Sequence, residues 1–256
     1  MIHPTAVVEK GAELDPTVEV APYAVIGARV RIGPRTRIGA HAVIEGDTTI
    51  GADNRIFQFA AIGAIPQDLK YAGEPTRLVI GNGNQIREFS TVHVGTAQGG
   101  GVTRVGNKCL LMANSHVAHD VELGDGCILA NSVAIAGHVK VQDHAIFGGL
   151  AAVHQFTRVG RLCFISGGAM VVQDVPPYMT VQGDRAEVIG INTVGLTRAN
   201  FSNDQLARVK GAYKILFRSK LGFREAIAHM RAEYGGNAEI DHLVAFLEGS
   251  ERGIAR

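Results

Sequence analysis

The chain has 256 residues, enough for one large domain or for one domain with a small appendage. Hydrophobic residues make up 46% of the chain and charged residues 19%, with a formal net charge of +1. That composition excludes intrinsic disorder and gives no electrostatic ground for binding nucleic acid or an anionic membrane. No apolar run approaches the roughly 20 residues that span a bilayer, and no secretory signal is visible. We expect a cytoplasmic, globular protein without a transmembrane segment.

From the N-terminus onward, an aliphatic residue recurs at every sixth position. The column runs without a gap through Ile2, Val8, Leu14, Val20, Ile26, Ile32, Ile38, Ile44, Ile50, Ile56 and Ile62. A period of six fits neither a helix nor a lone strand, and it is typical of a hexapeptide β-helix. Glycine often follows the aliphatic residue, so we expect glycines to form the corners, where positive φ is inexpensive only for glycine.

The column resumes at Ile80 and, one residue out of phase, continues from Val105 to Val171. Two excursions, residues 64–79 and 96–104, interrupt it. Long excursions from a regular scaffold are where functional residues usually lie. The sequence therefore predicts an all-β solenoid that carries functional residues on two loops.

Three cysteines occupy the small-residue position of their hexads. Cys109 and Cys127 are 18 residues apart, so they stack in neighbouring coils if three hexads make one coil. Cys163 follows the same logic. We expect buried thiols that act as small apolar fillers, and neither a disulfide framework nor a cysteine nucleophile.

Helical spacing replaces the six-residue period after about residue 185. We expect a β-helix over residues 1–185 and an α-helical domain over residues 186–256, with an N-cap at 202–204 and helices around 223–234 and 240–247. The helix that begins at this N-cap is basic and carries Arg208, Lys210, Lys214, Arg218 and Lys220. It is either a solvated face or a docking surface for an acidic partner.

Histidines gather at related positions of successive coils. Val117, Ile135 and Val153 are 18 residues apart, and His119, His138 and His154 follow them closely, with His116 at the adjacent corner. Neighbouring strands are about 4.8 Å apart, so the three later histidines can line a groove roughly 10 Å long. Two chemistries fit: a general base supported by the neighbouring Asp120, or three imidazoles that hold zinc.

Six motifs, in the right order over essentially the whole chain, resemble one family. They are the hexapeptide repeats, Gln67 to Arg77, His116-Val117-Ala118-His119-Asp120, Ala136-Gly137-His138-Val139, Val153-His154-Gln155-Phe156 and Gln173 to Tyr178, and the match includes the helical tail with Asn192 and Arg198. The chain is similar to the acyl-carrier-protein–UDP-N-acetylglucosamine acyltransferases that open lipid A synthesis.

The resemblance implies a left-handed parallel β-helix assembled as a homotrimer, with active sites between subunits and no metal or other cofactor. The reaction would pass a 3-hydroxyacyl group from acyl carrier protein to the 3-hydroxyl of UDP-N-acetylglucosamine. By motif, His119 would be the general base, Asp120 would orient it, and the backbone N–H of Gly137 would stabilise the oxyanion.

The resemblance also distributes substrate contacts along the chain. Gln67, Asp68 and Lys70 would engage the sugar from the first excursion. His116, His138, His154 and Gln155 would line the acceptor and acyl groove, and Asn192 and Arg198 would reach the nucleotide. Gly167, which lacks a side chain, would leave room for a longer acyl chain. An acidic acyl carrier protein would give the basic helix a partner.

Alternatives remain at this point. Val94, Val194 and Arg185 depart from residues common in the family, which allows a 3-amino sugar as the acceptor and an amide product. A zinc-dependent γ-type carbonic anhydrase shares the scaffold and the histidine chemistry. A non-catalytic trimeric scaffold is the third reading.

Overall fold

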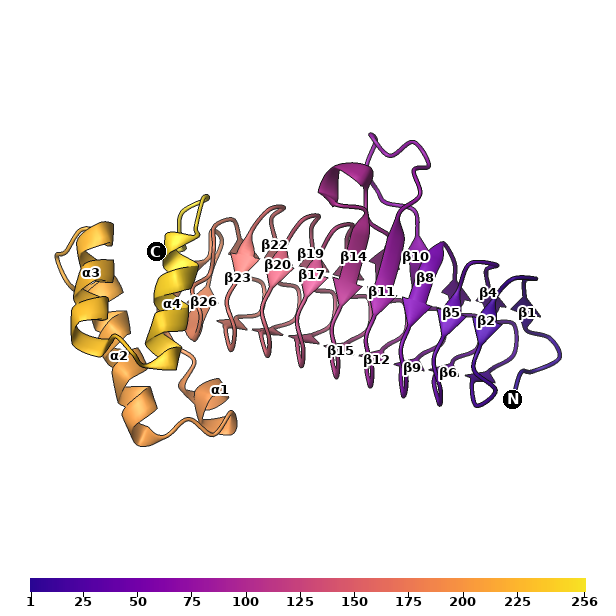
Figure 1. Ribbon diagram of the computed structural model, residues 1–256, viewed down its shortest axis with the longest axis horizontal. Coiled ribbons are helices and arrows are strands. Elements are labelled where there is room, and N and C mark those ends of the chain that lie inside the picture. Colours follow the sequence, from indigo (N-terminus) through magenta and orange to yellow (C-terminus); the bar gives the residue numbers. More distant parts are fainter.

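The computed structural model describes residues 1–256 as a triangular solenoid capped by helices (Figure 1). Its three sides are sheets of short strands, here called face 1, face 2 and face 3, and each coil gives one strand to each face. Face 1 contains β1 (Val7–Val8), β4 (Val25–Ile26), β7 (Val43–Ile44), β10 (Ala61–Ala64), β13 (Thr91–His93), β16 (His116–Val117), β19 (Ala134–Ile135), β22 (Ala152–Val153) and β25 (Met170–Val171).

The other two faces follow the same pattern. Face 2 contains β2 (Glu13–Leu14), β5 (Arg31–Ile32), β8 (Asp47–Ile50), β11 (Arg77–Ile80), β14 (Val102–Val105), β17 (Glu122–Leu123), β20 (Lys140–Val141) and β23 (Arg158–Val159). Face 3 contains β3 (Glu19–Val20), β6 (Arg37–Ile38), β9 (Arg55–Ile56), β12 (Gln85–Ile86), β15 (Leu110–Leu111), β18 (Ile128–Leu129), β21 (Ile146–Phe147), β24 (Phe164–Ile165), β26 (Met179–Gln182) and β27 (Glu187–Ile191).

The six-residue column is the core of the solenoid, as predicted. Strands pair in parallel between coils, with Val117 opposite Ile135 and Ile135 opposite Val153. These three side chains are at most 2% exposed. A two-residue strand can bury only its second side chain, so one aliphatic residue per hexad fills the interior of the coil. Only β27 runs antiparallel, against β26, and this hairpin ends the parallel stacking.

The prediction that positive φ explains the glycines that follow the aliphatic column was wrong, because most of those glycines do not have positive φ and most corner residues that do are not glycine. Tyr23, Asp53, Phe59 and Asp120 all have φ near +60°, although none is glycine. The repeated glycines answer a different need. A Cβ placed on Gly39 would lie 2.5 Å from the backbone N of the next coil, so glycine is there because successive coils approach too closely for any side chain.

The three cysteines are free and buried, as expected. Cys109 and Cys127 precede strands that pair in register, β15 and β18, so the two thiols lie in neighbouring coils. The Cys109 thiol donates to the carbonyl of Gly124 at 3.1 Å. Burial raises the pKa of Cys163 to about 12, which suits a filler and not a nucleophile.

The helical domain packs on the last coil (Figure 1). It contains α1 (Thr193–Arg198), α2 (Asn203–Arg218), α3 (Phe223–Tyr234) and α4 (Ala238–Glu248). Ser202 caps α2 by a capping box with Gln205, as the sequence suggested. The short α1 was not predicted, because six residues carry too little periodicity. None of the helices is both long and apolar enough to cross a membrane.

Both excursions leave the solenoid on the same side (Figure 1). The first joins β10 to β11, and the second joins β13 to β14 and contains the 3-10 helix η1 (Ala97–Gly99). Because the flanking strands are neighbours in their sheets, the two loops project from consecutive coils. Together they stand beside the corner at which face 1 turns into face 2.

Candidate active site

His119 and Asp120 form a hydrogen-bonded pair at the turn from β16 to β17. Nδ1 of His119 lies 2.8 Å from Oδ2 of Asp120, whose side chain is 1% exposed. Thr96 holds that carboxylate from the second excursion, through its hydroxyl at 2.6 Å and its backbone N–H at 2.9 Å. Because Nδ1–H donates to the carboxylate, the lone pair of Nε2 is left to accept a proton.

Gly137 lies directly against the imidazole of His119. A Cβ on Gly137 would stand 2.5 Å from Cε1 and 2.7 Å from Nε2 of His119, so a side chain there would have to displace the imidazole. Its carbonyl accepts from Phe156 at 3.1 Å, whereas its N–H makes no hydrogen bond within the chain. A free backbone donor therefore lies next to the free nitrogen of the ring.

His138 stands one coil beyond His119, with the ring centroids 5.0 Å apart in an edge-to-face arrangement. Its other face stacks on Phe156 at 4.4 Å. Burial lowers the pKa of His138, and the charge of Asp120, with a smaller effect from Asp68, opposes that shift. We call the turns that carry His119, His138 and Phe156 the histidine corner.

His116 does not occupy the corner as expected but projects from strand β16 on face 1. Its Nδ1 lies 2.7 Å from the hydroxyl of Thr91, and its ring meets that of His93 at 4.8 Å. Burial lowers the pKa of His93 to about 4, with further lowering from the charges of His116 and His119. His116 and His119 are therefore close neighbours on the same wall.

The first excursion stands over this corner. Asp68 is half-buried, whereas Gln67 and Lys70 are exposed. The carboxylate of Asp68 accepts from the backbone N–H of Lys70 at 2.9 Å, which fixes the local turn. Val94, one of the departures from the family pattern, is 3% exposed and belongs to the core.

His154 and Gln155 lie exposed one further coil along. Nδ1 of His154 is 3.1 Å from the carbonyl of Gln155 and 3.4 Å from Nη2 of Arg252. His154 is thus part of the same wall but does not contact His119 or His138. Of the four histidines predicted to line the groove, only His119 and His138 are in ring contact with each other, and His154 stands apart.

Asn192, Arg198 and Gly167 lie away from the histidine corner. Asn192 caps α1 through Gly195, and its amide donates to the carbonyl of Leu162 at 2.9 Å. Arg198 is exposed at the end of α1. Gly167 lies in the turn from β24 to β25, at the opposite edge of face 1 from His119, and is exposed.

Metal-binding atoms also meet at the corner. The ligand atoms of His119, Asp120 and His138 all lie within 4.8 Å of one another, and His154 is not among them. The zinc reading assumed three imidazoles. The structure brings together two imidazoles and a carboxylate, and Asp120 is already engaged by Thr96.

Some residues of the site gave no signal in the sequence. The hydroxyl of Thr103 accepts a hydrogen bond from the backbone N–H of Asp120 at 2.8 Å. Thr103 lies 17 residues before Asp120 in the sequence, and Thr96 lies 24 residues before it. A side chain on Gly99 would collide with the carboxylate of Asp120. Only the excursion itself pointed to them, because a hydrogen bond across coils leaves no local pattern.

Comparison with known proteins agrees with this geometry. The model of the domain 2 of UDP-N-acetylglucosamine O-acyltransferases matches residues 174–255, and that of the bacterial transferase hexapeptide matches residues 103–137. The acyl-[acyl-carrier-protein]–UDP-N-acetylglucosamine O-acyltransferase of Anaeromyxobacter dehalogenans is 60% identical over 255 residues, covering 100% of this chain and 99% of the relative. That of Myxococcus xanthus is 61% identical over 255 residues, with the same coverage.

A solved structure also has a closely similar fold. The UDP-N-acetylglucosamine O-acyltransferase of Moraxella catarrhalis is 41% identical, with a TM-score of 0.97 over 100% of this chain and 99% of that one. The parallel coils and the similarity over the full length of the chain agree. The chain belongs to the acyl-[acyl-carrier-protein]–UDP-N-acetylglucosamine O-acyltransferase family.

Proposed function

We propose that this chain transfers a 3-hydroxyacyl group from acyl carrier protein to the 3-hydroxyl of UDP-N-acetylglucosamine, as the first step of lipid A synthesis. The observation that carries the mechanism is the His119–Asp120 pair, fixed by Thr96 and placed against Gly137. The base His119, its orienting carboxylate Asp120 and the free N–H of Gly137 therefore lie close together.

The proton moves through Nε2 of His119. This nitrogen takes the proton of the sugar hydroxyl as its oxygen attacks the thioester carbon, and Asp120 supports the imidazolium that forms. The N–H of Gly137 donates to the tetrahedral oxyanion. Collapse of that intermediate breaks the carbon–sulfur bond, and the departing thiolate takes the proton back from His119.

The proposed substrate contacts follow the wall outward. Gln67, Asp68 and Lys70 reach the sugar from the excursion above the corner, and His138 lies beside the base. His116, His154 and Gln155 extend the wall to either side, and Asn192 and Arg198 serve the nucleotide from the helical domain. In this proposal residues 1–185 form the catalytic β-helix and residues 186–256 the helical domain.

The acyl chain is proposed to cross the outer surface of face 1. That surface carries small side chains, Ala134 and Ala152, between the histidine corner and Gly167. A Cβ on Gly167 would lie 3.3 Å from the carbonyl oxygen of Gly149, a tight contact that a shift of a few tenths of an ångström relieves. Gly167→Met should therefore fold and shorten the preferred acyl chain. An unchanged chain-length preference, read by mass spectrometry from a mixture of donors, would reject this path.

We further propose that the left-handed solenoid is a homotrimer whose subunits meet along face 1. Val7, Val25, Val43, Ala61 and Ala134 occupy outward positions there. Face 2 instead presents a row of charged side chains, which water can solvate without a partner. An apolar outer face of a solenoid is stable when a partner covers it, and the acyl groove would then lie between neighbouring subunits.

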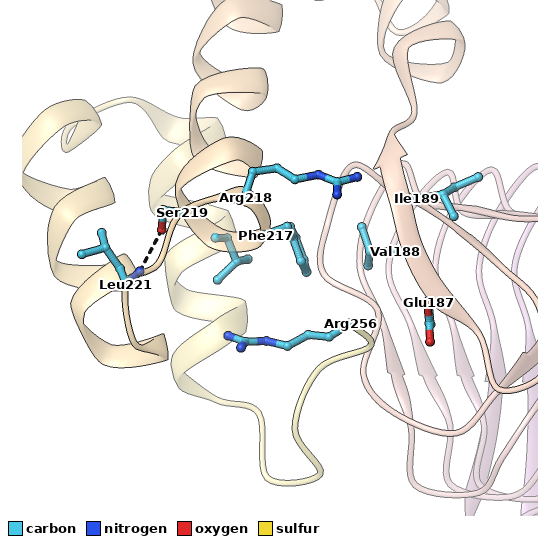
Figure 2. A pocket seen from close by; sticks show the side chains of 9 residues that line it. Glu187, Val188, Ile189, Phe217, Arg218, Ser219, Leu221 and Arg256 are labelled. Carbon is cyan, nitrogen blue, oxygen red and sulfur yellow. Dashed lines mark hydrogen bonds between the residues drawn. The ribbon is translucent and has the colours of Figure 1, made fainter.

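An acidic carrier protein is proposed to dock on α2. Lys210, Lys214 and Arg218 are exposed and recur every four residues, so they share one side of the helix. Arg208 does not belong to this surface, because its guanidinium pairs with Glu239 at 2.6 Å. A cavity of about 420 Å³ begins beside Arg218 (Figure 2), between α2 and β27.

The decisive experiment is a mass-spectrometric assay with UDP-N-acetylglucosamine and 3-hydroxyacyl carrier proteins of several lengths. A UDP-sugar that gains one hydroxyacyl mass supports the reaction. His119→Ala should lower turnover by about 10²- to 10⁴-fold while the protein stays folded. No product from the wild-type protein, or near-normal turnover in His119→Ala, would reject the proposal. In the first case the 3-amino sugar is the acceptor to test next.

A further inference from the structure

The C-terminal tail, residues 249–256, folds back onto the β-helix after α4 (Figure 1). The N–H of Ala255 donates to the carbonyl of Asp174 at 2.9 Å. The carboxylate of Asp174, whose side chain is 1% exposed, accepts from the hydroxyl of Ser250 at 2.8 Å. The tail is therefore anchored on both sides of Arg252.

Arg252 lines two neighbouring cavities of the groove. The first, of about 710 Å³, is also lined by His138, Lys140, Phe156, Arg158, Asp174, Gly249 and Glu251. The second, of about 450 Å³, is also lined by His154, Val172, Gln173 and Arg185. The first cavity begins at the histidine corner and reaches the level of Asp174 two coils away, which corresponds to roughly 10 Å. Arg252 thus lies in the same cavity as His138, where a substrate that extends from His138 along the groove would reach it.

The charge of Arg252 is not neutralised within the chain. Its Nη2 lies 3.4 Å from Nδ1 of His154 and 3.4 Å from the carbonyl of Val172, and neither group carries a negative charge. Neither Arg252 nor Arg185 takes part in an ion pair within 4.0 Å. Glu251, the one exposed acidic residue of the two cavities, belongs to the first and not to the second.

Two other cations of the groove, Lys140 and Arg158, are already engaged. Nζ of Lys140 lies 3.1 Å from Glu122. The guanidinium of Arg158 donates to the carbonyl of Phe246 at 3.2 Å and lies 4.2 Å from the centre of its ring. Arg252 and Arg185 are therefore the cations of the two cavities that remain free to bind an anion, and Arg252 is the one that the anchored tail holds in place.

We propose that Arg252 binds a phosphate group of a substrate, which makes the C-terminal tail a wall of the acyl-transfer site. A guanidinium fork can donate to two phosphate oxygens at once. The proposed function identifies the substrates, and each of them carries phosphate: the diphosphate of the UDP-sugar and the phosphodiester of the pantetheine arm. The helical domain would thereby complete the site on the β-helix, because α4 delivers the tail.

The test compares Arg252→Gln and Arg252→Lys with the wild-type protein. Calorimetry measures the Kd of UDP, and separately that of phosphopantetheine against pantetheine without phosphate. Arg252→Gln should raise the Kd of one phosphate-bearing probe by about 10- to 100-fold, and Arg252→Lys should recover part of it. The matched control is Arg35→Gln, which removes an exposed guanidinium paired with Asp53 at 2.7 Å on the N-terminal coils.

Each outcome decides. A change confined to UDP places Arg252 at the nucleotide, and one confined to phosphopantetheine places it at the carrier arm. Changes below twofold for both probes, with thermal midpoints unchanged, overturn the proposal. If Arg252→Gln lowers the thermal midpoint of unfolding, only the Kd values of Arg252→Lys are used, with the same twofold limit. Binding is measured without turnover, so a wild-type protein that binds UDP through Arg252 but makes no product would reject acyl transfer and keep the anion site.

Discussion

At the residue scale, Thr96 controls how Asp120 presents its carboxylate to His119. The hydroxyl of Thr96 and the Nδ1–H of His119 converge on the same oxygen, Oδ2, while the backbone N–H of Thr96 occupies Oδ1. Three donors leave the carboxylate a single orientation. In the proposed mechanism Thr96 is a positioning residue, because it is buried and acts through Asp120.

Thr96→Val should lower kcat by about tenfold or more with little change in KM, because a hydrogen bond to a buried charged group is lost. Thr96→Ser keeps the hydroxyl and should restore most of the rate. Steady-state kinetics on both variants, with circular dichroism as a check of folding, measures the effect. Equal rates for the valine and serine variants would show that the hydroxyl does not position Asp120.

His93 gives the stability of the protein a dependence on pH. Its pKa is lowered to about 4 in the folded chain, chiefly by burial, whereas an ordinary histidine titrates near 6.5. Between these values the unfolded chain binds a proton that the folded chain does not. The stabilisation is thus complete above pH 6.5 and is lost as the pH falls toward 4, at a slope of at most about 1.4 kcal/mol per pH unit.

His93→Phe should flatten this dependence, since phenylalanine fills the buried position and cannot be protonated. Thermal midpoints of the two proteins, followed from pH 7 to pH 4, measure the difference. The wild-type midpoint should fall more steeply. Parallel curves would mean that other groups, such as His116 and His138, whose pKa values are also lowered, account for the whole effect.

At the scale of elements, α2 combines two tasks on opposite sides. Val209, Ala212 and Leu216 pack into the helical core, and Lys210 and Lys214 are exposed to solvent. Charges that meet a partner at the surface act mainly on association and are screened by salt. The basic side of α2 should therefore affect the carrier-bound donor and leave the sugar nucleotide unaffected.

The double variant Lys210→Glu, Lys214→Glu should raise KM for the acyl carrier protein by about tenfold at low salt. The difference should shrink as salt is added, and KM for the UDP-sugar should not change. Lys10→Glu, Lys108→Glu, on the N-terminal and central coils, is the matched control. A KM for the carrier that is the same in both double variants would remove α2 from the docking surface.

At the scale of the whole molecule, the three faces of the solenoid have different outer surfaces. Face 1 is apolar and small along most of its length, and face 2 carries paired charges such as Lys140 with Glu122 and Arg31 with Asp47. Only a partner molecule can cover face 1, because the helical domain sits at the end of the solenoid and not along its side (Figure 1).

Ala134→Lys on face 1 should dissociate the proposed trimer, because it introduces a charge that association would have to bury. Thr49→Lys, an outward position of β8 on face 2, should leave assembly unchanged. Light scattering gives the mass of each variant, and the assay gives its turnover. A trimeric and fully active Ala134→Lys protein would show that face 1 is not the contact between subunits.

The sequence alone determined the solenoid, because one buried aliphatic residue per hexad is a local requirement repeated along the whole chain. Helices α2, α3 and α4 were also predicted, from a capping residue and helical periodicity. The motifs of His119 and Asp120 identified the family that the comparisons establish. These features are visible because each is written in residues that are close in the sequence.

Only the tertiary structure decided how the site is held together. Thr96 reaches Asp120 across 24 residues, and Arg252 reaches His154 across 98. The role of the repeated glycines, close approach of coils and not positive φ, also depends on neighbours one coil away. Contacts between coils depend on stacking in space, and a single sequence does not record which side chain on another coil or in the terminal tail will meet a given residue.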